Sequence, residues 1–91
     1  MEVEKLIYAL QETISYLRIS QPTESSNMPI DEIIRRLEAE LSKARSATPM
    51  DVILLDRLFA PTGMIQAISI ANGWGTKFLR ISEVVDQLTV N

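Results

Sequence analysis

Residues 29–45 read Pro-Ile-Asp-Glu-Ile-Ile-Arg-Arg-Leu-Glu-Ala-Glu-Leu-Ser-Lys-Ala-Arg, and this stretch decides the fold class. Its apolar side chains recur at steps of three and four residues, which is the spacing of one face of an α-helix. Pro29 suits a first helical turn, where its missing N–H group is not needed. Acidic residues follow the proline and basic residues close the stretch, so both ends favour the helix dipole. The apolar stripe is Ile30, Ile33, Ile34, Leu37, Leu41 and Ala44.

The first and last segments of the chain show the same spacing. Residues 2–19 carry an apolar stripe, and Arg18 falls at the end where a positive charge suits the helix dipole. Residues 76–89 carry another stripe, and Thr76 is suited to cap its first turn. Both segments are therefore expected to be helices. Their stripes are Val3, Leu6, Ile7, Leu10, Ile14 and Leu17 in the first, and Phe78, Ile81, Val85 and Leu88 in the second.

Residues 48–59 begin with a compact helix-start pattern. Thr48 is a common N-cap residue, Pro49 suits the first helical position, and Asp51 can complete an exchange like that of a capping box. The residues that follow are apolar on more than one face, which is typical of a central helix. We therefore expect a helix from this start through Phe59.

Residues 64–71, Met-Ile-Gln-Ala-Ile-Ser-Ile-Ala, fit two local structures. Ile65 and Ile68 have helical spacing, with Thr62 as the cap and Gly73 as the stop. Alternate residues of the same stretch also fit a short strand. A strand needs a partner, and the chain offers no second strand candidate, so a helix is the favoured interpretation.

The chain has 91 residues, 46% of them hydrophobic, which is enough for a single domain over residues 1–91. Residues 20–29 are polar with two prolines, and we expect them to form a mobile loop. The predicted fold is all-α, an irregular bundle of four to five helices. The predicted core is Leu6, Leu10, Ile14, Leu17, Ile33, Ile34, Leu37, Leu41, Leu54, Leu58, Ile68, Phe78, Ile81, Val85 and Leu88.

The sequence has no histidine and no cysteine. Catalytic triads, thiol chemistry, and zinc, haem or iron–sulfur sites that need imidazole or thiolate ligands are therefore excluded. Nor do the carboxylates converge by their spacing: Glu38 and Glu40 are two residues apart, and Asp51 and Asp56 are five apart. We expect a protein that is not an enzyme and that binds no metal and no cofactor.

Charge and hydropathy patterns limit the classes of partner that we expect. The net charge is −3, and residues 1–32 hold six acidic against two basic residues. No segment is basic enough to neutralise many phosphates, so nucleic acid is not the expected partner. The chain has neither an unbroken apolar stretch of membrane-spanning length nor the pattern of a secretory leader. We expect no membrane partner and a cytoplasmic location.

The only tryptophan, Trp74, lies between two glycines in a predicted turn. Tryptophan is enriched among interface anchors, so this turn, with Phe59 and Met64 nearby in the sequence, is a candidate partner-binding region. Tyr8 and Tyr16 lie partly off the stripe of the first helix and would extend it if they are exposed. The function we expect is a non-catalytic protein-interaction module, such as a small regulatory, adaptor or immunity-type protein. The competing interpretation of Trp74 is a plug over the core.

The same segments also allow two other kinds of partner, a second copy of the chain and DNA. The near-heptad stripe of residues 2–19 would also suit a homodimer. Residues 64–82 resemble a helix-turn-helix register, with Gly73 in the turn and Thr76, Lys77 and Arg80 available to contact DNA. A DNA-binding regulator is therefore the alternative function, although its second helix carries acidic residues as well.

Overall fold

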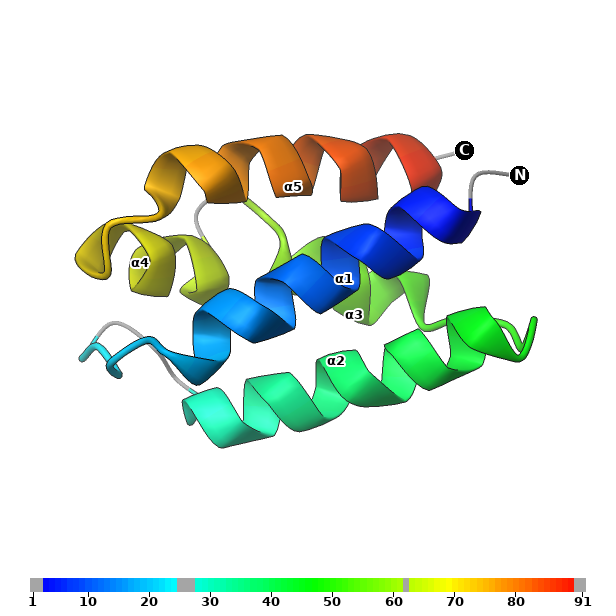
Figure 1. The fold of residues 1–91 in the computed structure, drawn as a ribbon, viewed down its shortest axis with the longest axis horizontal. Helices are drawn as coiled ribbons and strands as arrows, with labels where there is room; N and C mark the ends of the chain where they lie inside the picture. Colours follow the sequence, from blue (N-terminus) through cyan, green and yellow to red (C-terminus); the bar gives the residue numbers. More distant parts are fainter. Residues whose placement is uncertain (1–2, 25–27, 62, 90–91) are drawn as a thin grey trace.

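The computed structural model describes residues 3–24, 28–61 and 63–89. In these residues the chain forms five helices and no strand: α1 (Val3–Arg18), α2 (Ile30–Arg45), α3 (Val52–Leu58), α4 (Met64–Ala71) and α5 (Gly75–Thr89). The all-α prediction is confirmed, and residues 64–71 are helical, not a strand. Figure 1 shows α1 lying between α2 and α5, antiparallel to both, with α4 at one end of the molecule.

Helix α2 begins at Ile30, so Pro29 precedes its first turn. Pro29 is the N-cap, and its carbonyl accepts from the N–H groups of Glu32 and Ile33 at 3.0 and 3.1 Å. Glu32 pairs with both Arg36, at 3.1 Å, and Arg35, at 3.4 Å. These exposed pairs add little free energy, so α2 is held mainly by its apolar stripe.

The predicted start of the third helix is wrong by about one turn. Thr48 and Pro49 lie outside α3, and Asp51 is the N-cap, its Oδ1 accepting from the Leu54 N–H at 3.0 Å. The intervening chain instead closes α2: Ala47 has a positive φ of 55°, and the Thr48 N–H reaches the Lys43 carbonyl at 2.9 Å. This Schellman-type ending uses the residues that the sequence pattern assigned to the next helix.

Helix α4 closes in the same way, here with a glycine. Gly73 has a φ of +83°, and the Trp74 N–H bonds the Ser69 carbonyl at 2.8 Å. The Trp74 carbonyl then accepts from Phe78, so α5 starts at Gly75 and Thr76 lies inside the first turn instead of capping it. The other predicted cap, Thr62, lies outside the described residues.

Buried residues from all five helices form one hydrophobic core. Most of the predicted core residues are buried, but Ile34, Leu54 and Leu88 are only partly so. Leu55 takes the place expected of Leu54, so the buried face of α3 is offset by one residue from the predicted one. The buried hydrophobic residues that are absent from the predicted core are Ala9, Ala44, Leu55, Phe59, Ile65 and Trp74.

The connection between α1 and α2 contains no helix in its described residues, 19–24 and 28–29. Part of the predicted mobile loop, residues 25–27, lies outside the described residues. None of the helices described here has the length and apolar character to cross a membrane.

Candidate interaction surface

Trp74 is buried, with 5% of its surface exposed. Its ring stacks on Tyr16 at a centroid distance of 4.8 Å and meets the edge of Phe78 at 6.5 Å. The indole Nε1–H donates to Ser20 Oγ at 2.9 Å. Of the two interpretations of Trp74, the structure therefore supports the plug over the core and contradicts a tryptophan presented on the surface.

Asn72 links the same two parts of the chain through hydrogen bonds to the backbone of Gln21. Its Oδ1 accepts from the Gln21 N–H at 2.8 Å, and its Nδ2 donates to the Gln21 carbonyl at 2.9 Å. Nδ2 also donates to the carbonyl of Ile68 at 2.9 Å. We call the set of Tyr16, Ser20, Gln21, Asn72 and Trp74 the clasp, because it joins the end of α1 to the turn between α4 and α5.

Two more of the predicted partner-binding residues pack inward. Phe59 is 1% exposed and stacks on Phe78 with a centroid distance of 6.1 Å. Met64 is partly buried against the core. Together with Trp74, these side chains stabilise the fold and leave little surface for a partner to contact.

Tyr8 is the exception, because 75% of its surface is exposed. It lines a groove of about 320 Å³ between α1 and α5, which run antiparallel. The structure brings Tyr8 together with Lys77 and Arg80, which the sequence analysis offered as DNA contacts. Thr76, the third residue offered for DNA, is exposed and does not line the groove. We call this the α1–α5 groove, and its lining is Lys5, Tyr8, Ala9, Glu12, Lys77, Arg80, Ile81 and Val84.

The α1–α5 groove has an apolar floor and charged walls. Ala9 and Ile81 are 5% and 4% exposed, so they form the floor, whereas Lys77 and Arg80 are exposed. The structure shows no hydrogen bond or ion pair for these two cations among the residues it describes. The groove can therefore receive both an apolar side chain and negative charge.

A second hollow lies at the other end of the bundle, where α1, α2, α3 and α5 meet. It also measures about 320 Å³, and its lining is mostly apolar. Val52 lies at its edge with 46% of its surface exposed, and its neighbour Ile53 is 68% exposed. The sequence reasoning did not single out this surface, because both residues belong to a helix expected to be central.

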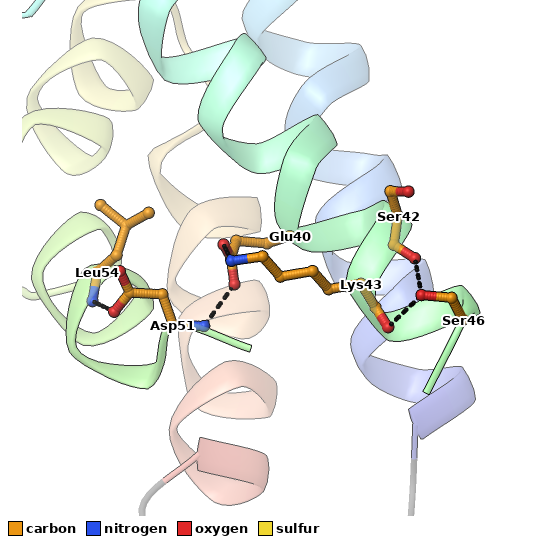
Figure 2. Close-up of polar contacts among 6 residues, drawn as sticks. All are labelled: Glu40, Ser42, Lys43, Ser46, Asp51 and Leu54. Carbon is orange, nitrogen blue, oxygen red and sulfur yellow. Dashed lines mark hydrogen bonds and ion pairs between the residues drawn. The ribbon is translucent and has the colours of Figure 1, made fainter. Parts of the chain in front are cut away.

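Glu40 is a buried charged residue whose burial the sequence reasoning did not predict. Its carboxylate accepts from the Asp51 N–H at 2.7 Å (Figure 2) and from Lys43 Nζ at 2.9 Å. The Glu40 side chain is 3% exposed. The hydrogen bond from Lys43 to Glu40 raises the pKa of that lysine above its ordinary value of 10.5. Position 40 falls between Leu37 and Ala44 on the apolar stripe of α2, which is the sequence signal that could have identified it.

This carboxylate already has its hydrogen bonds satisfied within the protein, so it has a structural role. Among residues 3–24, 28–61 and 63–89, no three acidic side chains gather closely enough to hold a metal ion.

Comparison with known proteins gives no relative: no family model, curated protein or solved structure matches the chain. Any function must therefore be argued from the surface itself.

Proposed function

We propose that the protein is a non-catalytic protein-interaction module of the regulatory, adaptor or immunity type, acting in the cytoplasm. The observation that carries this proposal is the exposure of Tyr8 on the wall of the α1–α5 groove. Tyrosine presents a large ring with few rotatable bonds, so binding orders it at little entropic cost, and it is enriched at interface hot spots.

The groove is formed by two helices that are packed together. Helices α1 and α5 pack directly against each other through buried residues that include Leu10, Ile81 and Val85. A partner would therefore meet a surface that is largely ordered before binding, which lowers the entropic cost of association. This arrangement suits recognition of a protein segment.

A photo-crosslinking amino acid at position 8 tests the proposal. In cells of the source organism, we expect Tyr8 replaced by benzoylphenylalanine to give one discrete crosslinked product. The control is the same replacement at Ala39, an exposed position on α2. Equal, diffuse products from both positions, or none from either, would refute the proposal. A product of twice the chain mass from position 8 alone would instead identify a homodimer as the partner.

DNA binding is a second candidate, favoured by one observation. The turn between α4 and α5 contains Gly73 at a φ of +83°, and exposed Thr76, Lys77 and Arg80 follow it on α5. This is the order expected of a helix-turn-helix. At low salt, the wild-type chain should bind duplex DNA and the double variant Lys77→Ala/Arg80→Ala should not. If neither the wild type nor the variant binds, DNA binding is refuted.

A further inference from the structure

We infer that the α1–α5 groove takes an acidic segment of the partner protein, in which carboxylates flank an apolar side chain. This inference rests on the proposed function and specifies the chemistry of the partner. Three of the groove residues are basic, Lys5, Lys77 and Arg80, against the single carboxylate of Glu12. The groove is thus locally positive on a chain whose net charge is −3.

The other basic side chains show why this local excess is informative. Four of the six basic residues outside the groove, Arg18, Arg35, Arg36 and Lys43, each pair with a carboxylate of their own chain. The other two, Arg45 and Arg57, have no such pair within the described residues, but they line neither of the hollows described above. Lys77 and Arg80 have no such pair within the described part of the chain, and they lie on the wall of a groove. Their charges therefore remain available to an outside anion.

The spacing of these groups suggests the form of the segment. Lys77 and Arg80 are three residues apart on α5, so they lie about one helical turn from each other. The planar guanidinium of Arg80 can hold one carboxylate through two parallel hydrogen bonds, and Lys77 can hold a second. Between the walls, the floor of Ala9 and Ile81 and the ring of Tyr8 provide apolar contact for a side chain such as leucine.

Glu12 favours an acidic peptide over nucleic acid as the occupant. A nucleic acid carries an uninterrupted row of phosphates, and the Glu12 carboxylate on the groove wall would repel it. A peptide can place its carboxylates beside Lys77 and Arg80 and leave the space near Glu12 neutral. Removing the charge of Glu12 should raise the affinity for an acidic peptide. A misfolded variant would not show such a rise.

The experiment is an NMR titration of the full ¹⁵N-labelled chain at low salt. The probe is a twelve-residue peptide of glutamate and leucine in an amphipathic order, and the comparison peptide has lysine in place of glutamate. We expect the acidic peptide to shift amides of residues 5–12 and 77–84 and the basic peptide not to do so. No shifts, shifts elsewhere, or equal binding of both peptides would overturn the inference.

Variants make the test specific. We expect Lys77→Gln/Arg80→Gln to weaken binding of the acidic peptide about tenfold and Glu12→Gln to strengthen it about twofold, as for exposed ion pairs. Arg45→Gln/Arg57→Gln, at two exposed positions outside the groove, removes the same two positive charges and should leave the affinity unchanged. Equal weakening by this double variant would show a non-specific charge effect and overturn the inference.

The outcomes also separate this inference from the proposed function. A crosslink at position 8 without a peptide response would keep the interaction module and refute its acidic partner. Duplex DNA that binds the same residues more tightly than the acidic peptide would refute both and favour the nucleic-acid candidate.

Discussion

Replacing Glu40 by alanine should destabilise the protein more than any other single change to a charged side chain described above. The substitution leaves the Asp51 N–H without its acceptor and removes the anion that Lys43 contacts. A hydrogen bond to a charged group contributes about 1.5–3 kcal/mol, and we expect a loss of about that size. Small domains have a total stability of about 5–15 kcal/mol, so the effect is easily measured.

Glu40→Gln separates the two contacts of the carboxylate. The amide oxygen can still accept from the Asp51 N–H, whereas the ion pair with Lys43 is lost. The Lys43 side chain is 38% exposed, so water screens this pair and its contribution to stability should be small. We therefore expect Glu40→Gln to be clearly milder than Glu40→Ala.

Urea denaturation at 25 °C, followed by the fluorescence of Trp74, measures these differences, because unfolding separates that indole from Tyr16. Glu38→Ala is the matched control: Glu38 pairs with Arg18, and both side chains are about half exposed. Glu38→Ala should cost less than about 1 kcal/mol. If Glu40→Ala were no more destabilising than this control, or no worse than Glu40→Gln, the argument from the Asp51 N–H would be refuted.

Four further predictions can be checked by denaturation. Leu55→Ala should cost about 2–5 kcal/mol and Leu54→Ala about 1–2 kcal/mol, because only Leu55 is fully buried; the reverse order would contradict the observed phase of α3. Trp74→Ala should cost about 3–5 kcal/mol, measured by circular dichroism, and unchanged stability would place its ring outside the core. Gly73→Ala should cost about 1 kcal/mol through backbone strain alone, because an added methyl group at its φ of +83° meets no atom within 4 Å. The hydrogen bond to Glu40 raises the pKa of Lys43 in the folded state, so the stabilising contribution of this lysine is complete below pH 10.5 and is lost as the pH rises above this value. Lys43→Met should therefore flatten the curve of stability against pH in that range. A curve parallel to that of the wild type would refute the assignment.

The helices were predictable where an apolar stripe runs for several turns. In α2, Ile33 and Leu37 are both fully buried, as the spacing requires. Helix α3 has only seven residues, which is too short for its stripe to fix the phase. Its start depends on a tertiary contact, the acceptance of the Asp51 N–H by Glu40, that no local pattern contains.

The candidate site was only partly predictable for a similar reason. Tyr8, Lys77 and Arg80 were each identified from their own segments, but their meeting in one groove depends on how α1 and α5 pack. Trp74 has the composition and flanking glycines of a binding turn, and only the position of Tyr16 and Ser20 shows that the indole is already occupied. Local sequence identifies the residue types, whereas their exposure is a property of the assembled fold.

The clasp also bears on the chemical ageing of the chain. Asn-Gly pairs are the sites where the next residue's backbone nitrogen attacks an asparagine amide and releases ammonia, and residues 72–73 form such a pair. In the folded protein both side-chain polar atoms of Asn72 are hydrogen-bonded, and the Gly73 N–H is bonded to Ile70. A carboxylate at position 72 could not donate to the carbonyl of Gln21. Folding thus protects the pair from deamidation, and a chain deamidated while unfolded would refold without this fastening.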